Sequence, residues 1–309
     1  MDDHVMSDHV RKLLQGAYDL HIHSAPDVRP RSVNDFELAE RFTKAGLKGF
    51  AIKAHYAPTS DRAFLLGLKY PHLKVAGGVV LNSTVGGVNP IAVETAARLG
   101  GKFVWFPTVD AKHDIDRLKN NVPIMVDMEL KLEKMGMKPF GITIFDDDGK
   151  LIPEVHFIID IINEYNLIMV TAHLSHEEAF ALVREGKKRG VKKMLVAHVD
   201  WKGTFYTVEE QREFIKLGAI LEHAYATTFV PHEELCVQMK ELGPEHFIIS
   251  TDLGMVTLPA GKNTGFYTQG QAPYPDEGMA LYVEILLKNG FSDQEIRKMI
   301  VENPEILLS

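Results

Sequence analysis

Histidines and acidic residues collect at the ends of short apolar runs in this 309-residue sequence. The first such run ends in Asp19-Leu20-His21-Ile22-His23. In a β-strand, residues two apart point to the same side, so both imidazoles can converge on one metal ion. Two runs in the second half of the chain end in His173 and His198, and the last run ends in Asp252. The pattern predicts a metal site with the ligands His21, His23, His173, His198 and Asp252.

This ligand set is typical of hydrolytic metal sites. A divalent metal held by neutral imidazoles and one carboxylate lowers the pKa of bound water toward about 7. Asp252 would orient that water, accept its proton and return it to the leaving group. The predicted reaction is cleavage of an amide, cyclic amide, lactone or ester. We expect one or two divalent transition metals, zinc first, with manganese, iron, cobalt and nickel as alternatives because they accept the same ligands.

Each of these residues alone has a structural explanation. A histidine at a strand end is commonly a hydrogen-bonding residue, and Asp252 before Leu253-Gly254 is a candidate cap for a turn. The joint order carries the argument. Unrelated structural histidines are not expected at matching ends of several strands.

The elements that position these residues repeat regularly. Apolar, β-branched runs alternate with amphipathic segments of helical length. The predicted strands are 18–23, 49–55, 74–81, 102–108, 167–173, 193–198, 219–223 and 246–252. Eight strand–helix repeats favour an α/β fold of the closed parallel (β/α)8 type, a TIM barrel, over an open doubly wound sheet. All strands of a barrel end on one face, which would place the predicted ligands together.

One segment interrupts the repeat after the fourth predicted strand. The turn sequence Asp146-Asp147-Asp148-Gly149 lies between two extended runs and predicts a β-hairpin over 139–152. A helical stretch over 125–135 precedes it. We interpret residues from about 122 to 153 as an insertion in a single domain that spans 1–309.

Composition limits the partners. The formal charge of −8 comes from 42 acidic and 34 basic residues without a dense Lys/Arg stripe, so nucleic acid is not expected. The single cysteine, Cys236, cannot form an intrachain disulfide. The N-terminal region has no apolar segment and no stretch is suited to span a bilayer, so we expect a cytoplasmic protein without a membrane partner. A small-molecule substrate is expected, and a homo-oligomer is compatible with the sequence.

The order of the motifs resembles the amidohydrolase superfamily. Barrels of that superfamily carry His-x-His on the first strand, single histidines on the fifth and sixth, and an aspartate on the eighth. The resemblance extends over nearly the whole chain and includes Ala172-His173-Leu174-Ser175 and the terminal Glu302-Asn303-Pro304-Glu305-Ile306-Leu307-Leu308. The resemblance is strongest for a poorly characterised amidohydrolase-like branch without a settled substrate. It therefore implies a type of reaction but no particular substrate.

The fourth predicted strand departs from that family. Many members bridge two metals there with a carboxylated lysine or a glutamate, whereas Phe103-Val104-Trp105-Phe106-Pro107-Thr108 offers neither. The second strand places Lys53 and His55 on the same side instead. Three roles are open for Lys53: a carboxylated bridging ligand, an ammonium that neutralises substrate charge, or a structural ion-pair partner. His55 is a ligand candidate or a group that orients the substrate.

Further substrate contacts are expected from the seventh strand and the loops. Adjacent strand residues face opposite sides, so only one of Glu222 and His223 points into the barrel mouth, and we predict His223. Trp201 follows the sixth strand. Arg29 and Arg31 follow the first strand, where they either grip a carboxylate or phosphate by fork geometry or remain solvated loop residues.

Three other functions stay open. The start Asp19–Ser24 with Asp27 and His55 also resembles the trinuclear phosphoesterases of the polymerase-and-histidinol-phosphatase family. Against that family, Asp252 is followed by Leu253-Gly254 where the family has Asp-x-His, and the third strand has Asn82 and Ser83 in place of a bridging glutamate. A decarboxylase or hydratase with the same ligands ranks next. A non-catalytic metal-binding protein is the last alternative, against which the intact ligand set argues.

Overall fold

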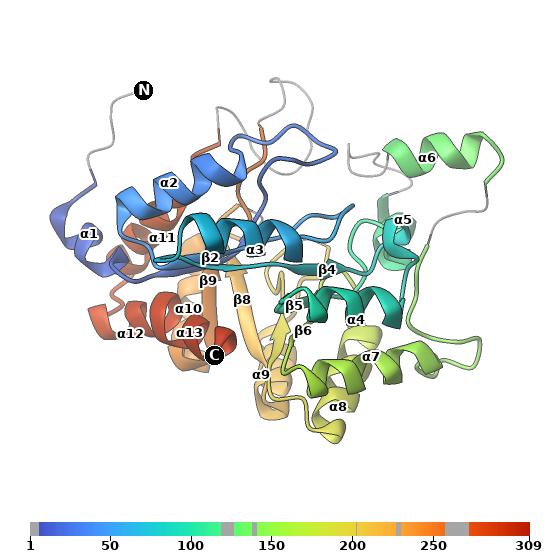
Figure 1. The fold of residues 1–309 in the computed structure, drawn as a ribbon. Coiled ribbons are helices and arrows are strands. Elements are labelled where there is room, and N and C mark those ends of the chain that lie inside the picture. The colour runs from blue at the N-terminus through green and yellow to red at the C-terminus, as the bar shows by residue number, and fades with distance from the viewer. Residues whose placement is uncertain (1–5, 119–126, 138–140, 202, 227–229, 257–271) are drawn as a thin grey trace.

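Parallel strands alternating with helices make up the computed structural model, which describes residues 6–118, 127–137, 141–201, 203–226, 230–256 and 272–309 (Figure 1). Every predicted strand is present, most of them with shorter ends. The strands are β1 (Tyr18–Ile22), β2 (Gly49–Ile52), β3 (Lys74–Ala76), β4 (Gly78–Val80), β5 (Phe103–Trp105), β6 (Ile168–Val170), β7 (Met194–Val196), β8 (Ile220–Ala224) and β9 (Phe247–Ser250).

The predicted third strand is divided into β3 and β4 at Gly77. A side chain at this position would lie 2.2 Å from the carbonyl oxygen of Thr59, so glycine allows the close approach. The break separates a three-stranded sheet, β1 to β3, from a six-stranded sheet, β4 to β9. The two sheets are therefore consecutive parts of one strand series.

Each strand pairs in parallel with the next strand along the chain, apart from that break. The last strand returns to the first, because the amide of Asp252 donates to the carbonyl of His21 at 2.9 Å and that of His23 to Leu253 at 2.8 Å. A doubly wound sheet would reverse its strand order at a switch point. The sequential order fits the predicted (β/α)8 fold instead.

The helices lie on the outside of the strands (Figure 1). Local signals set their ends: α2 begins with a capping box at Asn34 and ends at Gly46 in the left-handed conformation. The helices are α1 (Asp8–Leu14), α2 (Asp35–Ala45), α3 (Ser60–Lys69), α4 (Pro90–Arg98), α5 (Lys112–Leu118), α6 (Asp127–Lys134), α7 (Pro153–Glu164), α8 (His176–Arg189), α9 (Val208–Leu217), α10 (His232–Leu242), α11 (Pro275–Lys288), α12 (Asp293–Arg297) and α13 (Asn303–Leu308), with short turns η1 (Ser83–Val85), η3 (Pro244–His246) and the π-helical η4 (Lys298–Glu302).

Two apolar clusters form the core. The larger one lies between strands and helices, and includes Cys236 of α10. The smaller one gathers alternate strand residues such as Leu20, Trp105 and Ile248 with Leu307 of α13. Buried polar residues follow at the carboxyl ends of the strands, and they form the site described below.

The segment predicted as an insertion has a helix and a tight turn. Helix α6 confirms part of the helix predicted over 125–135. The predicted hairpin is reduced, within its described residues, to one antiparallel bridge between Phe145 and Leu151. Residues 119–126 and 138–140 lie outside the described residues, so the full insertion and the single domain remain predictions. No helix in the described ranges is long and apolar enough to cross a membrane.

Candidate metal centre

His21 and Asp252 form the centre of a buried cluster at the carboxyl ends of the strands. The Nε2 atom of His21 lies 3.1 Å from Oδ1 of Asp252, and Nε2 of His23 lies 3.0 Å from the same oxygen. Ligand atoms of His21, His198 and Asp252 lie within 4.8 Å of one another. Three predicted ligands from three strands thus converge on one point, and His23 joins them through Asp252.

The other two predicted histidines extend this cluster. The ring of His173 lies 5.2 Å from the ring of His198, and His55 stacks on His23 at 4.9 Å. All five imidazoles are buried. The structure therefore brings together every residue of the predicted ligand set, with His55 beside it.

Hydrogen bonds from outside the cluster orient several imidazoles. Nδ1 of His21 lies 3.0 Å from Glu222, Nδ1 of His173 lies 2.6 Å from Asp114, and Nδ1 of His55 lies 2.9 Å from Thr108. A carboxylate that accepts from Nδ1–H leaves Nε2 free to bind a metal. Asp114 was not predicted, because a residue in α5 has no fixed spacing to a strand end.

The prediction that His223 rather than Glu222 points into the site was wrong. Glu222 contacts His21 and also accepts a hydrogen bond from Ser250 at 2.6 Å. His223 faces the other side of β8, where Nδ1 lies 3.2 Å from Asp200 and the ring lies 5.1 Å from Phe247. Alternation along the strand was predicted correctly, but the sequence carries no signal for which residue faces inward.

Lys53 projects into the middle of the cluster from the end of β2. Its side chain is buried, and Nζ lies 3.0 Å from Nε2 of His21. Burial lowers the pKa of the Lys53 ammonium, although the charges of Asp252, Glu222 and Asp114 act in the opposite direction. A carboxylated ligand, a substrate contact and a structural charge partner therefore all remain predictions for Lys53.

The pKa values of the clustered side chains favour a site that binds a cation. Burial lowers the pKa of His55, His173 and His198, and burial together with the Arg31 charge lowers that of His23 to about 3. Burial also lowers the pKa of His21, but Asp252 and Glu222 outweigh it and raise the value to about 9.

Burial would raise the pKa of Asp252, but His21 and its other imidazole neighbours hold it well below the usual range. The donor set is therefore mostly neutral imidazole with an ionised carboxylate.

One atom of this set lacks a hydrogen bond. Nδ1 of His23 is buried and has no partner in the part of the chain that the structure describes. A buried nitrogen without a partner is unfavourable unless a ligand supplies the interaction. Imidazole and carboxylate donors at this spacing fit a divalent transition metal.

Unusual backbone conformations aim the ligands. Ala172 (φ 51°), His198 (φ 57°) and Asp252 (φ 51°) adopt the left-handed region two residues after the ends of β6, β7 and β9. Ala172 and Ala197 belong to the inner cluster, so simple alternation would send the next residue outward. The left-handed residues after β6 and β7 redirect the chain, so that His173 and His198 lie beside each other in the cluster. Such strain concentrates at functional sites.

The predicted substrate contacts divide into near and distant residues. The Trp201 ring lies 4.7 Å from His173 and 5.5 Å from His198. Arg31 is buried in an ion pair with Asp27, so it is not the solvated residue that the sequence allowed. Arg29 donates to the Tyr56 hydroxyl at 3.3 Å, whereas His223 is outside the cluster.

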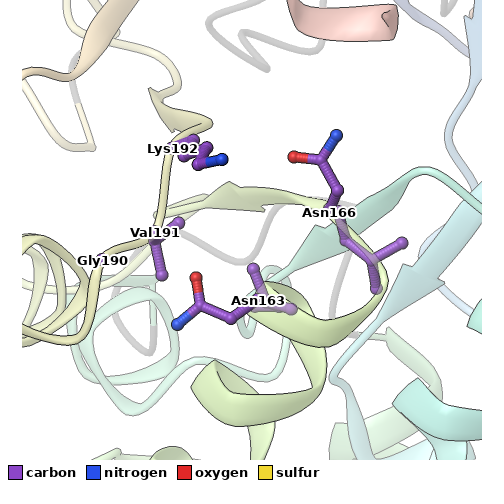
Figure 2. A pocket seen from close by; sticks show the side chains of 7 residues that line it. Asn163, Asn166, Gly190, Val191 and Lys192 are labelled. Atoms are coloured by element: carbon purple, nitrogen blue, oxygen red, sulfur yellow. The ribbon is translucent and has the colours of Figure 1, made fainter.

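A separate pocket lies at the opposite ends of the strands. It has a volume of about 270 Å³ and is lined by Asn163, Asn166 and Lys192 among others, before β6 and β7 (Figure 2). None of the predicted site residues lines it. This pocket and the histidine cluster are therefore independent.

Solved structures resemble this fold over nearly its full length. An organophosphorus hydrolase from Deinococcus radiodurans is 14% identical with a TM-score of 0.55, and the match covers 96% of this chain and 94% of that one. An amidohydrolase from Pseudomonas aeruginosa is 13% identical with a TM-score of 0.52, covering 97% of each chain. A TatD homologue from Escherichia coli K12 is 16% identical with a TM-score of 0.51, covering 95% and 98%. These likenesses confirm the expected fold.

Comparison of the sequence with known proteins finds one family. No curated protein matches the chain. One family model matches residues 16–222, which include β1 to most of β8 and every predicted site residue except His223 and Asp252. The chain belongs to DUF6282, a family of unknown function.

Proposed function

We propose that this protein is a metal-dependent hydrolase that cleaves an amide, cyclic amide, lactone or ester bond. One observation carries the proposal: ligand atoms of His21, His198 and Asp252 lie within 4.8 Å of one another. His23 shares the Asp252 oxygen at 3.0 Å. The fold shared with an amidohydrolase and an organophosphorus hydrolase supports the same class of chemistry.

The five predicted ligands would hold one or two divalent metals, with zinc as the first candidate. When bound, the metal supplies a nucleophile at neutral pH by acidifying water and polarises the oxygen of the bond under attack. Glu222 and Asp114 hold the imidazoles of His21 and His173 in the tautomer that presents Nε2. Trp201 covers His173 and His198 and would restrict access of water.

Asp252 is the residue that we propose to move the proton. Its Oδ1 atom contacts both His21 and His23, and Oδ2 is the second oxygen of the carboxylate. The low pKa of the carboxyl keeps it ionised and able to accept a proton. Oδ2 would take the proton from the attacking water and return it to the leaving group.

One structural detail bears on the phosphoesterase alternative. Asn82 occupies the third-strand position where that family has a bridging glutamate, and its amide donates to Thr108 at 2.7 Å and to the carbonyl of His55 at 3.0 Å. Asn82 is therefore committed to supporting His55. This contact favours the amidohydrolase-like reaction.

Metal analysis of the purified protein, combined with a screen of esters, lactones, amides and phosphoesters, tests the proposal. We expect one or two equivalents of metal, and hydrolysis that is lost with a chelator and restored by adding the metal. Hydrolysis that survives complete metal removal would refute the mechanism. Bound metal with no turnover in the whole screen would favour a non-catalytic metal-binding protein. Cytoplasmic location, a small-molecule substrate and oligomeric state remain predictions from the sequence.

A further inference from the structure

Arg31 is a buried cation on the loop that follows β1. Its side chain is 2% exposed, and Nε donates to Oδ2 of Asp27 at 2.8 Å. Backbone contacts fix this loop beside the segment that follows Asp252: the amide of Ser32 donates to Gly254 at 2.9 Å, and Arg31 pairs with Met255. The fold therefore builds Arg31 into the wall of the metal centre.

The guanidinium acts on the cluster electrostatically. After burial, the Arg31 charge is the strongest influence that lowers the pKa of His23, and it also lowers those of His55 and Lys53. Asp252 in turn stabilises the charged form of Arg31. The influence of a charge falls with distance, so these effects agree with the backbone contacts that bring the Arg31 loop beside the segment after Asp252.

Arg31 retains hydrogen-bonding capacity. A guanidinium has five N–H donors, whereas Asp27 accepts through a single oxygen. Nη2 of Arg31 lies 2.7 Å from that oxygen, but it forms no hydrogen bond of acceptable geometry with any described residue. Buried donors in native proteins normally have acceptors. A buried donor without a well-aligned acceptor on this loop is compatible with a bound ligand that supplies one.

We propose that Arg31 binds an anionic oxygen group of the substrate, a carboxylate or a phosphate, next to the bond that is hydrolysed. Both groups match the planar fork of a guanidinium. Asp27 is a positioning residue that holds this fork. The substrate class is then a small organic acid or a phosphorylated compound. This inference rests on the proposed hydrolase function, although the anion site itself can be tested separately.

Binding of acetate and of inorganic phosphate to the metal-loaded protein tests the anion site by calorimetry. We expect Arg31→Met to weaken binding of the better anion by about 10- to 100-fold, the effect of losing a charge-assisted hydrogen bond, with metal content unchanged. Arg31→Lys should recover part of the loss. The control is Arg98→Met, on the exposed surface of α4, which should bind normally.

Unchanged affinity in Arg31→Met would show that the metal alone holds the anion and would overturn the inference. If Arg31→Met fails to fold because Asp27 is left buried and unpaired, the double variant Asp27→Asn, Arg31→Met removes both charges. The same loss of anion binding is expected in that double variant.

Matched substrates separate this inference from the proposed function. N-acyl amino acids and their C-terminal amides share the scissile bond but differ in charge, and a phosphorylated ester compared with its alcohol tests phosphate. We expect a preference for the charged member that Arg31→Met abolishes through KM. Equal kcat/KM within both pairs would overturn the anion site but leave the hydrolase. Anion binding that depends on Arg31 without any hydrolysis would leave the site and refute the hydrolase.

Discussion

Two adjacent residues of β8 lie in different buried clusters. Glu222 faces inward and contacts His21, which also contacts Asp252 and Lys53. His223 faces outward and pairs with Asp200 at 3.2 Å. Both clusters contain buried histidine and carboxylate side chains.

The two clusters differ in whether potential ligand atoms from several strands converge on one point. Ligand atoms of three inner residues lie within 4.8 Å, and no comparable group around His223 is found among the described residues. Several strands meet at the inner face of the sheet, whereas the outer face meets helices packed by apolar side chains. Burial of a histidine is therefore weak evidence of a metal ligand, and convergence from several strands is strong evidence.

Removing both histidines of β1's carboxyl end should have the largest effect. We expect the double variant His21→Ala, His23→Ala to lose its metal and its activity together, because two imidazoles at the Asp252 oxygen are removed. Metal content by mass spectrometry measures this. His72→Ala is the control, since His72 is exposed and contacts Thr43. Full occupancy in the double variant would contradict the assigned centre.

Asp252→Asn should separate catalysis from metal binding. The amide keeps one oxygen ligand but cannot accept a proton at neutral pH. We expect turnover to fall by about 10²–10⁴-fold, the usual contribution of a general base, while most of the metal is retained. Turnover and metal content are measured on one preparation with the substrate found by screening. Near wild-type turnover with metal bound would leave Asp252 as a ligand only.

Lys53→Ala addresses the number of metals. A buried amine with a lowered pKa can react with carbon dioxide to form a carbamate. If that carbamate bridges two metals, Lys53→Ala should bind one metal fewer, and acetate or formate should partly restore the second. Lys53→Arg should not bridge. Unchanged stoichiometry in Lys53→Ala would instead assign the ammonium to substrate charge or to structure.

Glu222→Gln tests the support that the inner cluster receives from β8. The substitution keeps the shape of the side chain but removes the charge that orients Nδ1–H of His21. We expect metal affinity to fall by about 10- to 100-fold, as for other partners of ligating histidines. Competition with a chelator measures the affinity. Unaltered affinity would mean that the tautomer of His21 is set by other contacts.

His223→Asn should have the smallest effect and serves as the neighbouring control. The amide can still donate to Asp200, so we expect the free energy of unfolding to fall by only about 1 kcal/mol. Metal content should not change. Denaturant unfolding and metal analysis check both expectations. Loss of metal in this variant would remove the distinction between the two faces of β8.

The strands and the ligand set could be predicted because local patterns specify them. Apolar β-branched runs locate β1 to β9, and the motif at His21 and His23 follows from the two-residue repeat of a strand. These features depend on residues that are close together in the chain, so the sequence alone is enough to predict them.

Tertiary structure decided how those ligands reach one point. In β1, a register shift between Asp19 and Ile22 changes the alternation, so that His21 and His23 face the mouth although Leu20 belongs to the inner core. At Ala172 and His198, left-handed residues redirect the chain after β6 and β7.

The partners Asp114 and Asp27 were likewise visible only in three dimensions. Residue type and spacing determine which side chains can bind a metal, but register, backbone strain and long-range contacts depend on how the whole fold packs.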